Sequence, residues 1–135
     1  MVLVDSNVLI DIFTDDPHWL PWSAARLSEA AAEGELAINP VIYAELAAGF
    51  DRAAQLERAL AHWPLVRLPL PYEAAFAAGH AFLAYRREGG VRRSPLPDFY
   101  IGAHAAHARI PLLTRDAMRY RRYFPKLALI APDAD

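Results

Sequence analysis

The sequence predicts an α/β fold, a three-layer α/β/α sandwich with a central parallel sheet of four to five strands. Short apolar runs, which suit strands buried on both faces, alternate along the chain with longer segments of helical periodicity. This alternation implies a parallel sheet that is covered by helices on both faces. The chain has 135 residues, 55% of them hydrophobic, which is enough apolar surface for one core. We therefore expect a single domain over residues 1–135.

The N-terminal part is expected to begin with a buried strand and a helix. The apolar run 1–4 predicts the strand, and residues 5–7 supply capping side chains for the helix behind it. A second helix is expected over residues 22–32, with Gly34 ending it in the left-handed conformation. The apolar run Leu36–Ile38 predicts the second strand.

Asn39 and Pro40 predict the start of the next helix, because Asn caps free amides and Pro is tolerated in the first turn. That helix is expected over residues 40–50, and Asp51 is expected to cap another that reaches about residue 62. Apolar residues at 65–70, bounded by prolines, predict the third strand.

The C-terminal part is expected to continue the alternation. An Ala-rich helix is predicted over residues 72–88, followed by a loop over 89–95 that is too polar to pack and should be mobile. The remaining elements, in chain order, are a helix over 97–109, a strand over 111–114, a helix over 116–123 and a strand over 127–130.

Charge is distributed unevenly along the chain, although the net charge is only −2. Residues 1–85 carry four Arg against eleven acidic residues, whereas residues 86–135 carry nine Arg and one Lys against five. Because a polyanion is attracted by a single basic wall, this asymmetry points to an anionic partner. The alternative is ordinary solvated surface charge.

The composition excludes several kinds of site. Without cysteine, the chain has no disulfides or thiolate metal sites, so any metal must be held by oxygen or imidazole. No run of about twenty apolar residues and no basic leader is present, so we expect a cytoplasmic protein without membrane contact.

Four acidic residues are expected to converge at one edge of the sheet, where open parallel sheets bind ligands. Asp5 ends the first strand, and Asp116 follows the fourth. Asp98 lies in the first turn of a helix, and Glu45 stands alone in an apolar helix. Carboxylates that share a site repel one another unless a cation such as Mg²⁺ or Mn²⁺ balances them. Taken singly, the aspartates are also explained as helix caps, and Glu45 as a surface residue.

Three further groups of residues, histidines, arginines and aromatic residues, are also candidate parts of a site. His104 and His107 share a helix but lack a third metal ligand, so we interpret them as structural or solvated. Arg115, Arg119 and Arg122 are spaced for one helical face, from which they can meet a phosphate. The larger aromatic residues are interpreted as core or interface. These are Trp19, Trp22, Tyr43, Trp63, Phe76, Phe82 and Tyr85.

Four motifs together resemble the PIN-domain family, and the chain length resembles that of its VapC-type toxins. They are VDSNVLI (4–10), NPVIYAEL (39–46), LPDFYIGAHA (96–105) and LLTRD (112–116), with a later YFP (123–125). The motifs follow the family's order over nearly the whole chain. Ser6 stands where threonine is also frequent, so the hydroxyl is kept.

The resemblance implies a metal-dependent endoribonuclease, using Mg²⁺ or Mn²⁺, that forms a homodimer and is inhibited by a small antitoxin. Asp5 and Asp98 would be the principal metal ligands, completed by Glu45 and Asp116, and water would be the nucleophile. Supporting or substrate-binding roles are expected for Ser6, Asn7, Thr114, Arg115, Arg92 and Arg93. With Arg86 and Arg87, the last two would grip the RNA backbone.

An amphipathic antitoxin segment is expected to lie on the apolar helices of the N-terminal half. The expected groove is formed by Trp19, Trp22, Leu46, Phe50 and Trp63.

Two other functions stay open. A phosphatase or phospho-receiver domain would use the aspartate after the first strand as a nucleophile, but the second acid of such sites is missing and the only lysine is Lys126. A catalytically inactive PIN-like module would only bind a protein or RNA. The presence of all four acids argues against it.

Overall fold

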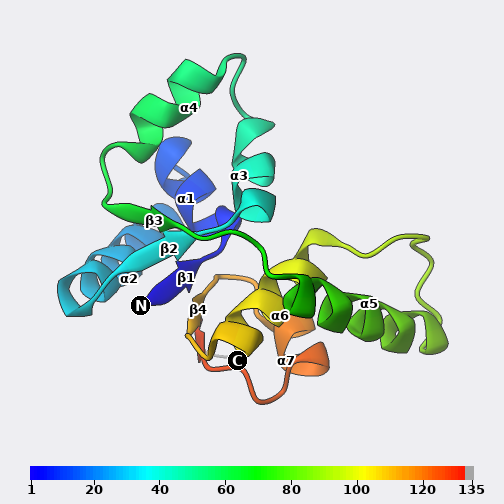
Figure 1. Ribbon diagram of the computed structural model, residues 1–135. Coiled ribbons are helices and arrows are strands. Elements are labelled where there is room, and N and C mark those ends of the chain that lie inside the picture. The colour runs from blue at the N-terminus through cyan, green and yellow to red at the C-terminus, as the bar shows by residue number, and fades with distance from the viewer. Residues whose placement is uncertain (133–135) are drawn as a thin grey trace.

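The computed structural model describes residues 1–132. Within them, five short strands form one parallel sheet in the order β3-β2-β1-β4-β5. The predicted parallel α/β architecture is therefore confirmed, with five strands (Figure 1). The strands are β1 (Val2–Val4), β2 (Leu36–Ile38), β3 (Leu65–Arg67), β4 (Leu112–Leu113) and β5 (Leu129–Ile130).

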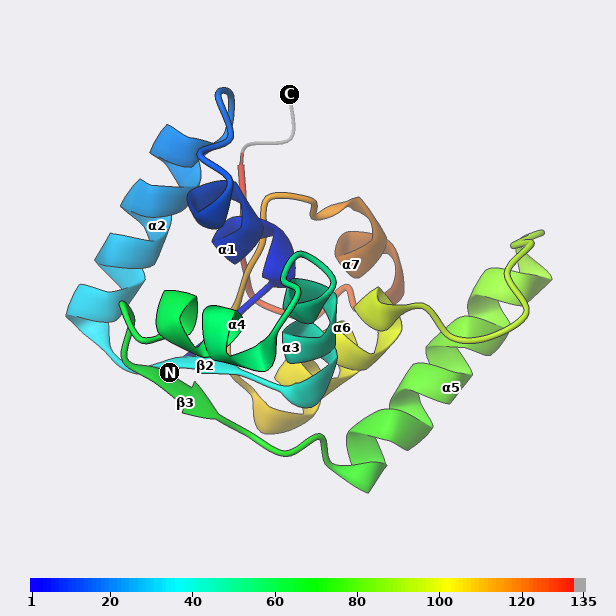
Figure 2. The same cartoon turned by 90° about the horizontal axis from the view of Figure 1, so that it is seen from above.

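Helices cover both faces of the sheet. In Figure 1, α1, α3 and α4 lie on one side of it, and α5, α6 and α7 lie on the other. Figure 2 shows α6 and α7 together, with α5 packed along α6 on the outside of the molecule. The helices are α1 (Ser6–Phe13), α2 (Leu20–Glu33), α3 (Pro40–Ala47), α4 (Ala53–Leu60), α5 (Tyr72–Arg87), α6 (Pro97–Ala108) and α7 (Met118–Tyr123).

The core follows from the apolar strands. Because helices cover both faces, every side chain of β2 and β4 is buried, which explains their uninterrupted apolar runs. The main cluster joins these strands to α1, α2, α3, α4 and α6. A smaller cluster between α5 and α6 is built on Ala74, Ala78, Phe99 and Ala103.

The order of the strands places a switch in direction between β1 and β4. The chain runs from β1 to β2 and β3 on one side, and then returns to β4 on the other side of β1. Val4 lies opposite Leu113, and the Asp5 N–H donates to the Leu113 carbonyl at 2.9 Å. The residues that follow β1 and β4 are therefore neighbours, where ligands of such sheets bind.

Local capping chemistry explains which helix boundaries were predicted well. Helix α3 begins at Pro40 as predicted, because Asn39 Oδ1 accepts the Ile42 N–H at 2.9 Å. Two predictions were wrong. Gly34 is extended, with φ 178°, rather than left-handed. Asp51 does not cap α4, since Arg52 is the N-cap residue and the Gln55 side chain accepts the N–H groups of Asp51 and Arg52.

Other elements are shorter than predicted. Helix α3 ends at Ala47, β3 ends at Arg67 before the prolines, and α7 begins at Met118 rather than at residue 116. The loop between α5 and α6 is largely exposed, as expected for a polar segment. Within residues 1–132, no helix is both long and apolar enough to cross a membrane.

Candidate active site

Asp5 is a buried carboxylate, 3% exposed, at the end of β1. Its Oδ1 accepts the Ser6 N–H at 2.8 Å, as an N-cap residue of α1. Its Oδ2 accepts the hydroxyl groups of Thr114 and Tyr120, both at 2.9 Å, and lies 3.4 Å from the amide nitrogen of Asn7. Strand β1, the end of β4 and α7 thus all hold this one side chain.

Asn7 and Thr114 link the ends of the two central strands. The side-chain amide of Asn7 donates from Nδ2 to the Thr114 hydroxyl at 3.1 Å, and Asn7 Oδ1 accepts the backbone N–H of Arg115 at 3.2 Å. The Thr114 hydroxyl in turn donates a hydrogen bond to Asp5. These contacts fit the supporting role expected for Asn7 and Thr114, since they fix the rotamer of Asp5.

Glu45 reaches the same region from α3. Its Oε1 accepts the Ser6 hydroxyl at 2.9 Å, so Ser6 connects the start of α1 with α3. Burial raises the pKa of Glu45, and the charges of Asp5 and Asp98 raise it further, against the Ser6 hydrogen bond. Glu45 is therefore a half-buried member of an acidic group rather than a free surface residue.

Asp98 completes the group from the first turn of α6. Its Oδ2 accepts Arg119 Nη1 at 2.9 Å, and its Oδ1 lies 3.4 Å from the Tyr120 hydroxyl. Tyr120 thus lies between Asp98 and Asp5, with its shorter hydrogen bond to Asp5. We call Asp5, Glu45 and Asp98 the acidic group.

The acidic group is electrostatically coupled. Burial raises the pKa of Asp5 from 3.8 to about 6; the hydrogen bonds from Thr114 and Tyr120 oppose this shift, and the Asp98 charge adds to it. Burial and the nearby Asp5 and Asp98 charges hold the pKa of Tyr120 far above its usual range. The phenol therefore keeps its proton and acts as a neutral donor at this site.

Asp116 stands apart from these three. Its side chain is exposed, while its backbone N–H donates to the Thr114 hydroxyl at 3.2 Å. It lines, with Asp98 and Arg119, a cleft of about 280 Å³ next to the acidic group. The structure thus brings three of the four predicted acids together and places the fourth in a cleft that it shares with one of them, Asp98.

The donor chemistry of the acidic group fits a hard divalent cation, because carboxylate oxygens are the ligands that Mg²⁺ and Mn²⁺ prefer. Burial is the main cause of the raised pKa of Asp5 and of Glu45, with a smaller contribution from neighbouring carboxylates, and a cation would offset both effects by favouring the charged carboxylates. Among residues 1–132, however, no three carboxylate or imidazole side chains are already arranged as metal ligands. Arg119 and Tyr120 instead occupy Asp98.

The comparisons with known proteins decide the family. A family model of the PIN domain matches residues 2–125. The chain belongs to the PIN-domain family. No curated protein matches the sequence.

Solved structures share the fold of this PIN domain at low sequence identity. VapBC2 from Rickettsia felis has a TM-score of 0.75 and 20% identity, covering 98% of this chain and 100% of that one. VapBC-1 from nontypeable Haemophilus influenzae has a TM-score of 0.72 and 20% identity, covering 97% and 98%. A toxin–antitoxin complex from Klebsiella pneumoniae has a TM-score of 0.64 and 23% identity, covering 98% of each chain.

The three arginines near the last acid of the PIN domain do not share one helical face, contrary to prediction. Arg115 precedes α7, and its Nε contacts both carboxylate oxygens of buried Asp11, at 2.8 and 3.0 Å. Arg122 pairs with Glu88 at 2.9 Å. Only Arg119 contacts the acidic group, through Asp98.

The histidines agree with their structural interpretation. His104 is buried, and its Nδ1 lies 2.9 Å from the amide nitrogen of Asn39. Because the side-chain oxygen of Asn39, Oδ1, already caps α3, its Nδ2 group donates and His104 Nδ1 accepts. Burial, with a contribution from His107, lowers the pKa of His104, so the ring stays neutral. His107 is exposed.

The expected antitoxin groove is not assembled as predicted. Leu46 is only 1% exposed and belongs to the core, so it cannot line a surface groove. Trp63 lines a separate hollow with Leu60 and Arg67 at the sheet edge. Of the aromatic residues assigned to core or interface, Trp22, Tyr43 and Trp63 pack against the core, whereas Phe76 is 70% exposed.

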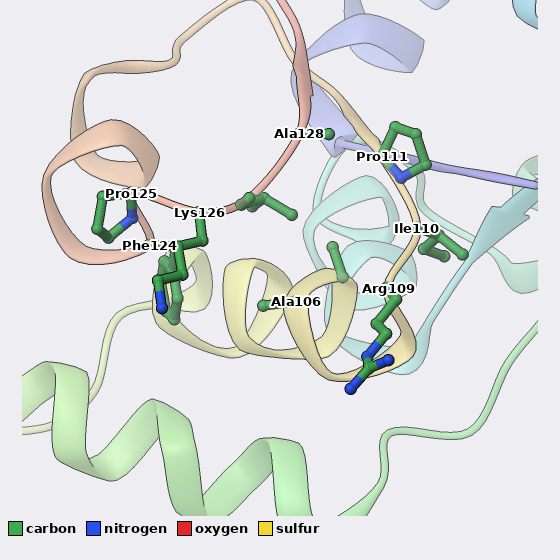
Figure 3. Close-up of a pocket in the computed structure, with 10 residues that line it drawn as sticks. Ala106, Arg109, Ile110, Pro111, Phe124, Pro125, Lys126 and Ala128 are labelled. Atoms are coloured by element: carbon green, nitrogen blue, oxygen red, sulfur yellow. The ribbon is translucent and has the colours of Figure 1, made fainter.

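The PIN domain also has a hollow of about 700 Å³ away from the acids (Figure 3). It lies at the C-terminal end of α6, beside Pro111 at the start of β4, and thus at the edge of the sheet opposite Asp5. Its lining is mostly apolar, with Arg109 and Lys126 as its charged residues.

Sequence reasoning missed Tyr120 and Asp11 as site residues. Tyr120 fits the helical spacing of apolar residues, so the sequence predicts a core residue there. Only its position on the helix after Asp116 could have indicated a role in the site. Asp11 lies on the first helix, two turns beyond Asp5. Its partner Arg115 is more than a hundred residues away in sequence, so the pair has no local signal.

Proposed function

We propose that this PIN domain is a metal-dependent endoribonuclease toxin, which hydrolyses RNA phosphodiester bonds in the cytoplasm and is neutralised by a cognate antitoxin. The observation that carries the proposal is the convergence of Asp5, Glu45 and Asp98, from three separate elements, at the switch point of the sheet. Their coupling is of the kind that a divalent cation relieves.

Different side chains of the site would have different roles in this reaction. Asp5, Asp98 and Glu45 would hold the cation, with Asp116 at the rim. An Mg²⁺ or Mn²⁺ ion in this place would lower the pKa of an attacking water and stabilise charge on the phosphate. Thr114 and Asn7 orient Asp5, and Ser6 orients Glu45. Attack by water predicts products with a 5′-phosphate and a 3′-hydroxyl.

The basic loop between α5 and α6 is the proposed contact for the RNA backbone. Arg92 and Arg93 are exposed there. Arg86 donates to the carbonyl groups of Gly90 and Arg92, at 3.2 and 2.8 Å, and so ties the loop backbone to the end of α5. The Arg92 and Arg93 side chains can then face the solvent and a phosphate chain.

An antitoxin and a second copy of the chain are the proposed partners. The toxin–antitoxin complex from K. pneumoniae has this fold, which supports a protein inhibitor here too. Helix α5 exposes 92% of Tyr72 and 70% of Phe76. Large exposed side chains of this kind support a protein interface on α5, and a homodimer is the simplest symmetric use of it.

The test is RNA cleavage by purified, antitoxin-free protein with Mg²⁺ or Mn²⁺, beside Asp5→Asn and Asp98→Asn. Each substitution should reduce the rate by about 100-fold or more, because even residues that only support metal ligands contribute up to that factor. EDTA should abolish cleavage. Asp51→Asn is the matched control, since this carboxylate is exposed, precedes α4 and is not a member of the acidic group, and it should cleave at the parental rate.

Two outcomes would contradict the proposal. Cleavage that persists in EDTA, or in both site variants, would show that the acidic group does not carry the reaction. Failure of the parent protein to cleave any cellular RNA would favour the inactive binding module. End-group analysis of the products adds an independent check, because a 2′,3′-cyclic phosphate would exclude water as the nucleophile.

A further inference from the structure

Arg119 occupies a carboxylate that the proposed function assigns to a cation. Its Nη1 lies 2.9 Å from Asp98 Oδ2, and both side chains are partly exposed, at 40% and 31%. Asp98 Oδ1 faces the Tyr120 hydroxyl at 3.4 Å. Both oxygens of Asp98 are therefore directed at residues of α7, and a cation can use Asp98 fully only if Arg119 leaves it.

Two other arginines of this segment, Arg115 and Arg122, are paired with acids outside the acidic group. Arg115 lies on Asp11, whose side chain is 1% exposed, so its departure would leave a buried charge unpaired. Arg122 and the Tyr123 hydroxyl both bind Glu88, at 2.9 and 2.6 Å. Of Arg115, Arg119 and Arg122, only Arg119 pairs with a proposed metal ligand, Asp98. A bound cation would therefore replace the positive charge that Asp98 loses when Arg119 leaves.

A released Arg119 would stay beside the reaction. It lines the cleft of about 280 Å³ together with Asp98, Asp116 and Arg122. This cleft adjoins the acidic group, where the scissile phosphate must lie if the proposed function holds. A guanidinium group can donate two parallel hydrogen bonds to a phosphate. The carboxylates of Asp98 and Asp116 in the same cleft repel a phosphate unless a positive charge offsets them.

We propose that Arg119 is a substrate-binding residue with two alternative partners. Without a divalent cation it pairs with Asp98; when the cation takes Asp98, Arg119 turns to a backbone phosphate of the RNA in the adjoining cleft. The exchange leaves Asp98 beside a positive charge in both states and makes RNA binding depend on the cation. This inference rests on the proposed function and names a substrate contact within it.

The first test measures Mn²⁺ binding by isothermal titration calorimetry, without RNA, for the parent protein, Arg119→Ala and Arg122→Ala. Arg119→Ala should bind Mn²⁺ about two- to fivefold more tightly, because the cation no longer displaces a partly exposed ion pair. Arg122→Ala removes the same charge from the same cleft but not from Asp98, so its affinity should match the parent. An Arg119→Ala affinity equal to or weaker than the parent's would overturn the exchange.

The second test measures how the affinity for a labelled single-stranded RNA depends on salt, in EDTA and with Ca²⁺ replacing Mg²⁺. RNA integrity is checked on a gel. With Ca²⁺, Arg119→Ala should lower the slope of log affinity against log salt by about one, the value for one lost phosphate contact. In EDTA its slope should equal the parent's. An equal fall in both buffers, or no fall in either, would overturn the conditional contact.

These measurements separate this inference from the proposed function. The calorimetry involves neither RNA nor turnover, so its result stands even if the parent protein cleaves no RNA. Conversely, cleavage by the parent that depends on Asp5 and Asp98, combined with unchanged Mn²⁺ binding and unchanged salt slopes in Arg119→Ala, would support the nuclease and reject Arg119.

Discussion

Asp5 is a carboxylate whose charge the folded protein disfavours until a cation balances it. Its pKa of about 6 lies above the ordinary 3.8, with burial as the main cause. The unfolded chain therefore gives up this proton more readily than the folded chain. The stability from this group is complete below about pH 4 and is lost as the pH rises through about 6.

We predict that cation-free protein loses stability over this pH window and that Asp5→Asn removes much of the loss. The shift corresponds to roughly 3 kcal/mol, so the variant should gain up to about that much over the parent between pH 4 and pH 7. Urea unfolding in EDTA over a pH series measures it, with Asp51→Asn as the exposed control. Parallel profiles for the parent and Asp5→Asn would contradict the account, and Mn²⁺ should restore the parent above pH 6.

Among single residues, the sequence pointed to the acids and to Ser6, Asn7 and Thr114 beside them, but not to the α7 residues that contact Asp5 and Asp98. Asp5 and Glu45 stand out in the sequence because each interrupts or ends an apolar run. Tyr120 and Arg119 carry no such mark, since an aromatic residue and an arginine are ordinary on any amphipathic helix. Their contacts with Asp5 and Asp98 depend on how α7 packs against α6, which is a tertiary event.

Among the elements, α1 and α2 are joined to the β4–α7 connection by one ion pair, whose carboxylate is buried. Asp11 on α1 accepts the Ser23 hydroxyl of α2 at 2.7 Å and the Arg115 guanidinium at 2.8 Å. The Arg115 guanidinium also lies 5.5 Å above the Trp19 ring. This contact fixes the segment that carries Thr114 and Asp116 against the first two helices.

We predict that Asp11→Ala destabilises the fold by about 3 kcal/mol or more, because it leaves Arg115 and Ser23 without their buried partner. Urea denaturation gives the free energy of unfolding. The control is Glu29→Ala, which breaks the exposed Arg26–Glu29 pair on α2 and should cost at most about 0.5 kcal/mol. Equal, small losses in the two variants would show that the Asp11 pair does not hold these elements together.

Elements with local chemical signals were predicted most accurately. The start of α3 follows from Asn39 and Pro40 alone, because both act within one turn. Gly34 and Asp51 misled because glycine and aspartate also occur where no left-handed residue or side-chain cap is required. The late start of α7 reflects the hydrogen bond from the Asp116 N–H to Thr114, which holds this turn outside the helix.

For the whole molecule, alternation predicted the parallel sheet but not its order. Nothing local in residues 1–4 or 111–114 says that β4 pairs with β1, yet this pairing places Thr114 on Asp5. The direction switch at β1 and β4 therefore creates the site, and the sequence motifs only mark the residues that will meet there. The uneven distribution of charge between residues 1–85 and 86–135 is a second property of the whole molecule, and it follows directly from the sequence.

The basic C-terminal part, residues 86–135, should determine how RNA binding responds to salt. Exposed Arg92 and Arg93 lie on the α5–α6 loop, whereas Arg52 and Arg58 are exposed near and on α4, in the acidic part of the chain, residues 1–85. The double variant Arg92→Ala/Arg93→Ala should weaken RNA binding and lower the salt slope by about two, one for each lost phosphate contact. Sequence preference should change little, because phosphate contacts do not read bases.

The matched control is Arg52→Ala/Arg58→Ala, which removes the same charge from the acidic part of the chain, residues 1–85. If the RNA meets a basic wall formed around the loop, this control keeps the parental slope while the loop variant does not. If binding responds only to net charge, both double variants lower the affinity alike, because each changes the molecule by two charges. Fluorescence anisotropy over a salt series distinguishes the two, and equal slopes in both variants would remove the loop from the RNA-binding surface.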